Sequence, residues 1–171
     1  MTEAAKTECD LATLVERGGV HYDVSGTNAK ELLANAINLL PPIPALDPAS
    51  LLQEMLDREA LASTGIGRGI ALPHPRSPML GKDGGSANTP PLVAVIFPAQ
   101  NLDWNTPDGS KVHTLFLIVS STAQQHLGVL SKITFLCQQE QFRSLIASRS
   151  PRDQIITAIR EAENTWTRSS A

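Results

Sequence analysis

Two of the four histidines in this sequence stand where an imidazole could do nucleophilic or acid–base chemistry. His74 lies between Pro73 and Pro75, directly after the apolar stretch Ile70–Leu72. Pro73 has a fixed φ, and Pro75 restricts the residue before it to extended conformations, so a stiff backbone holds the His74 imidazole at a strand end. A reactive histidine and an ordinary turn histidine at the surface both fit this local pattern.

Two further residues could assist chemistry on an anion. His126 lies in the first turns of a helix expected to begin near Thr122. Unpaired backbone N–H groups and the positive end of the helix dipole favour a phosphate there. Arg58 follows an apolar helical stripe, and its guanidinium could hold a phosphoryl group. The alternatives are an exposed first-turn histidine for His126 and a side chain that complements the helix C-terminus for Arg58. His21 and His113 belong to expected strands, and we interpret both as structural.

Composition excludes several classes of protein. The net charge of −3 predicts no basic surface for nucleic acid or for an anionic membrane. The longest apolar runs are too short to span a bilayer, and the first ten residues contain no apolar signal segment. Two cysteines cannot build a disulfide framework, and no residues have recognisable metal-ligand spacing. We therefore expect a cytoplasmic domain without metal or cofactor, which neither binds nucleic acid nor inserts into a membrane.

Apolar periodicity and capping signals predict strands mixed with helices. Continuous apolar runs favour strands that are buried on both faces. The expected strands cover residues 20–24, 92–97 and 112–120, and the expected helices cover residues 28–40, 47–58, 122–137, 140–147 and a last segment from 150. Residues 65–69 are expected to form a flexible tight turn, and residues 79–91 a surface loop. The fold class is α/β (α+β): a single domain with a mixed β-sheet flanked by helices. We expect the domain at residues 11–162, with flexible termini at 1–10 and 163–171.

The segment that ends at His74 resembles a known active site. Residues 57–74 read DREALASTGIGRGIALPH. This closely resembles the pattern R-E-x-x-x-S-T-G-I-G-x-G-I-A-x-P-H of enzyme IIA domains of the bacterial phosphoenolpyruvate-dependent phosphotransferase system, in the mannitol/fructose class that includes the nitrogen-regulatory enzyme IIA. The H-L-x-x-L motif that begins at His126 is similar to that family too, and the resemblance extends over roughly residues 11–162.

The resemblance implies a function and a role for each residue. His74 takes the place of the histidine that carries the phosphoryl group, Arg58 that of the active-site arginine, and His126 that of the second active-site histidine. The implied donor is the histidine phosphocarrier protein. The implied acceptor is an enzyme IIB side chain, whereas regulatory members serve no sugar. The implied second partner is thus an enzyme IIB component or a regulated target protein. No metal or nucleotide is implied.

Three forms of this function stay open at the level of sequence. No attached IIB or IIC segment occurs within the 171 residues, which favours the regulatory, nitrogen-type form. The alternatives are a sugar-specific IIA component that passes phosphate to a separate IIB/IIC permease, and a protein-binding module controlled by phosphorylation. Two departures from the family pattern concern donor docking: Pro75 stands where the family usually has glycine, and the loop at 80–91 is longer than usual.

Overall fold

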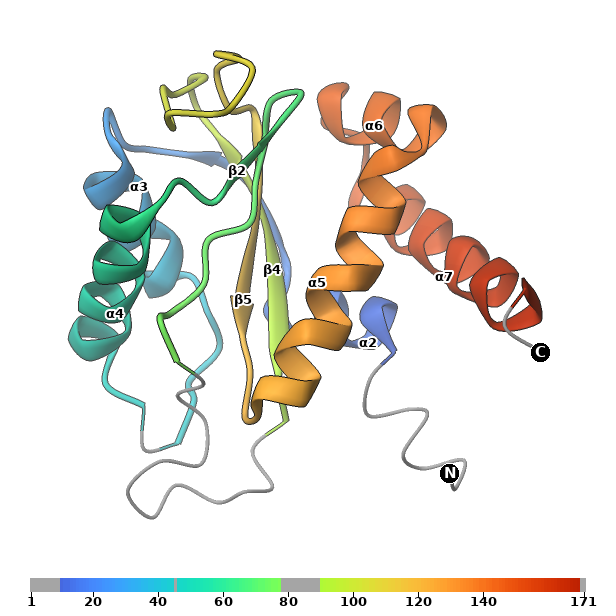
Figure 1. Cartoon of the computed structure of the whole chain (residues 1–171), viewed down its shortest axis with the longest axis horizontal. Coiled ribbons are helices and arrows are strands. Elements are labelled where there is room, and N and C mark those ends of the chain that lie inside the picture. The colour runs from blue at the N-terminus through green and yellow to red at the C-terminus, as the bar shows by residue number, and fades with distance from the viewer. Residues whose placement is uncertain (1–9, 45, 78–89, 170–171) are drawn as a thin grey trace.

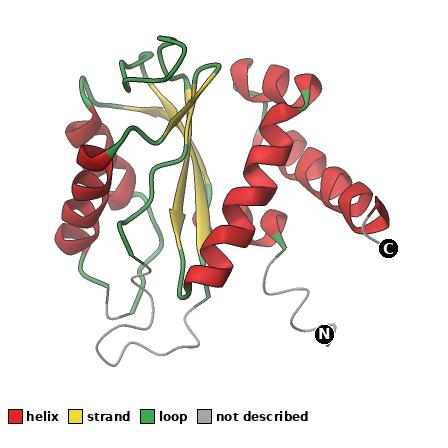
Figure 2. Ribbon diagram, in the orientation of Figure 1, coloured by secondary structure: helices red, strands yellow, loops and turns green. Residues whose placement is uncertain are grey.

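A five-stranded mixed β-sheet runs through the middle of the molecule, with helices on both of its faces (Figure 1, Figure 2). The computed structural model describes residues 10–44, 46–77 and 90–169. The strands are β1 (Val20–Val24), β2 (Gly65–Gly67), β3 (Ile70–Ala71), β4 (Leu92–Pro98) and β5 (Thr114–Val119). This α/β architecture confirms the fold class predicted from the sequence.

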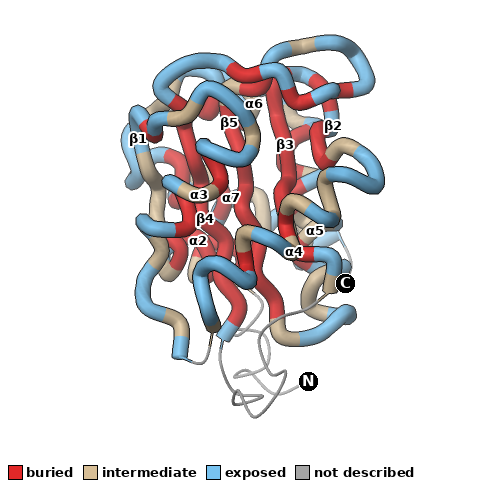
Figure 3. The backbone as a smooth tube through the Cα atoms, turned by 90° about the vertical axis from the view of Figure 1, so that its left-hand side faces the viewer, coloured by how far each residue is buried: buried red, intermediate tan, exposed pale blue. Residues whose placement is uncertain are grey.

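The strand order is β1-β4-β5-β3-β2. The two longest strands, β4 and β5, pair antiparallel, while β1 runs parallel to β4 and β3 runs parallel to β5. The short strand β2 closes the edge as the antiparallel partner of β3. Every residue of β4 and β5 is buried, as expected of continuous apolar runs (Figure 3).

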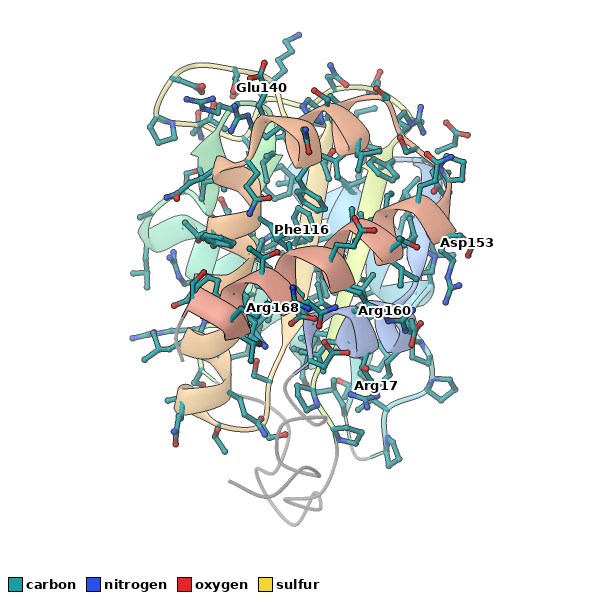
Figure 4. All side chains as sticks on the ribbon, turned by 90° about the vertical axis from the view of Figure 1, so that its right-hand side faces the viewer. Arg17, Phe116, Glu140, Asp153, Arg160 and Arg168 are labelled. Carbon is teal, nitrogen blue, oxygen red and sulfur yellow. The ribbon has the colours of Figure 1, made fainter. Side chains whose placement is uncertain are left out.

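The helices form one layer on each face of the sheet. One layer contains α3 (Ala29–Asn38) and α4 (Pro48–Leu61). The other contains α2 (Leu11–Gly18), α5 (Ala123–Gln138), α6 (Glu140–Ala147) and α7 (Arg152–Ser169). Each layer has its own apolar core against the sheet. In the second layer α7 lies across the molecule beside α2, where Arg160 forms an ion pair with Glu16 (Figure 4).

Three helices begin at the capping residues that the sequence predicts. The side chains of Asn28, Asp47 and Thr122 accept hydrogen bonds from the backbone N–H three residues further on, at 3.0, 3.0 and 3.2 Å. These bonds satisfy donors that have no partner within the helix. No helix of the described residues is long and apolar enough to cross a membrane.

The structure differs from the expectations in three places. Residues 65–69 do not form the flexible tight turn that we expected. They form strand β2 and the turn that connects it to β3, so β2 and β3 make an antiparallel hairpin. Helix α2 is an additional element, whose first N–H groups are bound by Glu163 of α7. Residues 163–169, expected as part of a flexible tail, continue α7, because Glu163 pairs with Lys132 at 3.0 Å and the Trp166 ring packs on Phe135. The expected N-terminal tail, apart from Asp10, and most of the 79–91 loop lie outside the described residues.

Candidate active site

The three residues singled out by the sequence come together at one site. His74 follows β3, Arg58 lies in the last turn of α4, and His126 is the fourth residue of α5. The Arg58 Nε lies 3.2 Å from His74 Nε2. The His74 and His126 rings have centroids 4.6 Å apart and planes tilted by 54°. Three elements distant in sequence therefore converge on the His74 imidazole.

The contacts of the His74 ring determine its tautomer. His74 Nδ1 lies 2.7 Å from the Leu72 carbonyl oxygen, which can only accept a hydrogen bond. The proton of the neutral ring is therefore on Nδ1. Its Nε2 then carries the lone pair, consistent with the N–H that Arg58 directs toward it. Nε2 is therefore the ring nitrogen that has a lone pair available for nucleophilic chemistry.

Both histidines of the site favour the uncharged state. Burial lowers the pKa of His74 from 6.5 to about 4, and the charges of His126 and Arg58 add to this effect, while the hydrogen bond to Leu72 opposes it. Burial and the Arg58 charge also lower the pKa of His126. At neutral pH the site thus presents an unprotonated His74 Nε2, whose lone pair accepts a hydrogen bond from the permanently charged Arg58 guanidinium.

His126 occupies the positively polarised end of a 16-residue helix. Its own backbone N–H donates to the Thr122 carbonyl at 3.0 Å, the first intrahelical bond of α5. The N–H groups of Ala123 and Gln124, which precede it, have no acceptor within the helix. An anion at this end therefore meets an imidazole, free backbone donors and the helix dipole.

A polar network behind the site, with Thr64 and Trp104 buried, holds the segment that leads from β3 to His74. The Thr64 N–H and hydroxyl donate to the Glu59 carboxylate at 2.8 and 2.6 Å, and Trp104 Nε1 donates to the Thr64 hydroxyl at 3.1 Å. The Thr64 carbonyl in turn accepts from the Leu72 N–H at 3.0 Å. Glu59 and Thr64 are fixed letters of the motif, but sequence reasoning assigned no role to them or to Trp104. Their role is to position the Leu72–His74 backbone.

The hairpin glycines of the motif are required by close packing. Gly69 has φ +77°, and a Cβ there would lie 2.3 Å from the His113 ring. Gly67 has φ +88°. His113 itself is held by Thr114, whose hydroxyl lies 2.7 Å from its Nδ1, and His21 Nε2 lies 2.9 Å from the Gly18 carbonyl. These contacts agree with our interpretation of both histidines as structural.

The contacts of His74 form although Pro75, the residue that departs from the family pattern, is next to it in the chain. Pro75 is buried, and the next residue, Arg76, donates its N–H to the Glu54 carbonyl of α4 at 3.3 Å. The segment after His74 is therefore fixed to the same helix that carries Arg58. The described residues contain no group of three side chains suited to hold a metal ion. The chemistry that this site can support is nucleophilic attack by His74 Nε2 on an electrophile that carries negative charge.

Comparison with known proteins identifies the family. Residues 13–162 match the family model described as "Phosphoenolpyruvate-dependent sugar phosphotransferase system, EIIA 2". The chain belongs to this family, and it is an EIIA domain, a phosphoryl carrier of a phosphotransferase system. The resemblance stated from the His74 motif is thereby confirmed.

Individual relatives include both regulatory and sugar-specific proteins. The chain is 27% identical to a "Nitrogen regulatory protein" of Pseudomonas aeruginosa, over 90% of this chain and 97% of the relative. It is 23% identical to the "PTS system fructose-specific EIIABC component" of Bacillus subtilis, over 88% of this chain but only 23% of that longer protein. Among solved structures, the nitrogen regulatory protein IIA-Ntr from Neisseria meningitidis superposes with a TM-score of 0.72 at 25% identity, covering 86% of this chain and 97% of that one.

Proposed function

We propose that the chain accepts a phosphoryl group on Nε2 of His74 from a histidine phosphocarrier protein. The observation that carries this proposal is the fixed tautomer of His74, with Nδ1 bonded to the Leu72 carbonyl and Nε2 directed at Arg58. As Nε2 bonds to phosphorus, the phosphorus–nitrogen bond to the donor histidine breaks. The Leu72 carbonyl then stabilises the positive charge that develops on the His74 ring.

Arg58 and His126 are assigned to the charge of the transferring group. Phosphoryl transfer requires mainly positioning and electrostatic stabilisation from the protein. Arg58 is anchored by its Nη1 to the Ala62 carbonyl at 2.8 Å, which leaves other guanidinium donors for phosphoryl oxygens. His126 lies beside His74 and offers a ring N–H to a phosphoryl oxygen. Neither residue becomes the lasting carrier in this proposal.

Exposed apolar side chains next to the site offer a docking surface for the protein donor. Leu127 follows His126 directly and is 64% exposed, and Leu61 lies one turn beyond Arg58 and is 66% exposed. Exposed large apolar residues near a reactive group suit a transient protein–protein contact. The partners assigned to this surface are the histidine phosphocarrier protein, and an enzyme IIB component or a regulated target protein. Since these exchange phosphoryl groups in the cytoplasm, we assign the chain to the cytoplasm.

The regulatory, nitrogen-type form of the function is the one we favour. The relative named as a nitrogen regulatory protein matches this chain over nearly its full length, and so does the IIA-Ntr structure. The sugar-specific form is the second candidate, supported by the fructose-specific relative. Phosphorylated protein incubated with a purified enzyme IIB of the fructose class separates the two. Rapid loss of phosphate from His74 supports the sugar-specific form, and retention supports the regulatory form.

The central proposal is tested by in vitro phosphorylation. The chain is incubated with phosphoenolpyruvate, enzyme I and the histidine phosphocarrier protein, and the modified residue is mapped. We expect an acid-labile, base-stable phosphoramidate on His74, with ¹⁵N and ³¹P coupling that assigns it to Nε2. His74→Ala should accept no label. Labelling of that variant at the wild-type level, or attachment to Nδ1, contradicts the proposal.

A further inference from the structure

A groove lies at the opposite end of α5 from His126. It is formed where the β2–β3 hairpin approaches the end of α5 and the start of α6, near the top of Figure 1. Its volume is about 250 Å³. The hairpin contributes Ile66, Arg68 and Ile70, and the helices contribute Thr134, Gln138 and Arg143. Nothing in the phosphoryl-transfer function described above uses this groove.

Two arginines give the groove its charge. Arg143 is fixed in place, because its Nη1 donates to the Cys137 and Gln138 carbonyls at 3.0 and 2.6 Å. Arg68 is exposed, and its guanidinium makes no hydrogen bond or ion pair with the described residues. Its backbone is nevertheless held, since its N–H donates to Asp108 at 2.8 Å and its φ is +56°. The turn thus fixes the Arg68 backbone at the edge of the groove, while the Arg68 guanidinium has no partner among the described residues.

The remaining lining residues contribute no opposing charge. No acidic side chain lines the groove, while Thr134 and Gln138 add neutral donors. Ile70 is buried and Ile66 is 41% exposed, so one wall is apolar. Burial raises the pKa of the Cys137 thiol to about 12, so this lining residue is also uncharged. A positive, partly apolar groove of this size matches a small anion with a short apolar body.

We propose that this groove binds a small organic anion. Its carboxylate or phosphate group lies between Arg68 and Arg143, and its apolar part lies on Ile66. The site is distinct from the phosphoryl site, although both are built on the same elements: β3 leads from the groove to His74, and α5 joins the groove to His126. Binding does not require phosphorylation of His74.

The proposal is tested by NMR titration of the full ¹⁵N-labelled chain with butyl phosphate. Inorganic phosphate serves as the probe that lacks the apolar body, and 1-butanol as the probe that lacks the charge. We expect butyl phosphate to shift the amides of residues 66–70 and 134–138 and to bind more tightly than inorganic phosphate, while 1-butanol leaves these amides unshifted. Arg68→Gln should weaken binding by about 10-fold or more, because it removes a charge-assisted contact. Arg68→Lys should retain most of the affinity.

The matched control is Arg168→Gln, which removes an exposed arginine from the last turn of α7 (Figure 4). This variant should bind butyl phosphate as the wild type does, and thermal melting should show that all three variants fold. Shifts restricted to residues 72–76 and 122–126 would assign the anion to the phosphoryl site alone and overturn the proposal. Equal binding by wild type and Arg68→Gln, or equal shifts with 1-butanol, would overturn it too.

Discussion

His74 should stay uncharged at pH values where an ordinary histidine is protonated. Burial is the main cause, and the neighbouring Arg58 and His126 charges act in the same direction, which together lower the pKa of His74 to about 4. The perturbation is a titration from pH 8 to pH 3.5. We therefore expect the His74 ring to stay largely unprotonated over about two pH units below the ordinary pKa of 6.5.

The size of the effect follows from the two pKa values. At pH 5.5 a histidine with the ordinary value is about 90% charged, whereas one with a pKa of about 4 is roughly 3% charged. The folded chain thus binds fewer protons than the unfolded chain below pH 6.5. The free energy of unfolding therefore keeps its full His74 contribution above pH 6.5, and this contribution decreases as the pH falls from 6.5 toward 4. Because the ring is partly exposed, solvent screening limits this loss to about 1–2 kcal/mol.

The assay is an NMR titration of the histidine ring carbons and nitrogens, with His74→Gln used to assign the His74 signals. We expect a His74 midpoint well below 5.5 in the folded chain and near 6.5 in the urea-unfolded chain. Chemical denaturation at pH 7 and pH 5 should show a smaller acid-induced loss of stability in His74→Gln than in the wild type. A His74 midpoint of 6 or above in the folded chain would refute the argument that burial and the adjacent charges control this residue.

Three other predictions concern the side chains around the site. Arg58→Gln and His126→Ala should each slow phosphorylation of His74 while the melting temperature stays close to that of the wild type. For His126→Ala we expect a rate loss of about 10²–10³-fold. A large loss of stability with a normal rate of transfer would assign a structural role to the residue instead. Thr64→Val removes the hydroxyl that accepts from the buried Trp104 N–H and donates to Glu59 Oε2, although the backbone N–H of residue 64 still donates to Glu59 Oε1. The variant should therefore cost about 2–4 kcal/mol in urea denaturation, whereas Thr64→Ser should cost less than half of that. Gly69→Ala should destabilise the chain by about 2 kcal/mol or more, because the new Cβ would clash with the His113 ring and residue 69 has a positive φ. Gly128→Ala, where a Cβ on α5 meets open space, should stabilise the chain by about 0.5–1 kcal/mol. Equal effects of the two substitutions would contradict this account.

Local signals in the sequence correctly predicted most elements. The caps Asn28, Asp47 and Thr122 act through bonds to residues three positions away, so a short window of sequence contains all of the necessary information. The continuous apolar runs at β4 and β5 predicted strands buried on both faces, and every residue of these two strands is buried. Hairpin β2–β3 and helix α2 were not predicted. Both are short, and each depends on a distant partner: β3 pairs with β5, and Glu163 binds the first N–H groups of α2.

The candidate site divides in the same way. The sequence by itself singled out three residues that the structure brings together, because His74 between two prolines, Arg58 at a helix end and His126 in a first helical turn are local features, and the motif that contains the first two is long. Only the tertiary structure decided that the ring centroids of His74 and His126 lie 4.6 Å apart and that Nε2 is the unprotonated ring nitrogen. It also decided that burial lowers the pKa of His74. Tautomer and pKa depend on which carbonyl, charge and apolar surface the folded chain brings to the ring, and residues from three separate elements supply these only after folding.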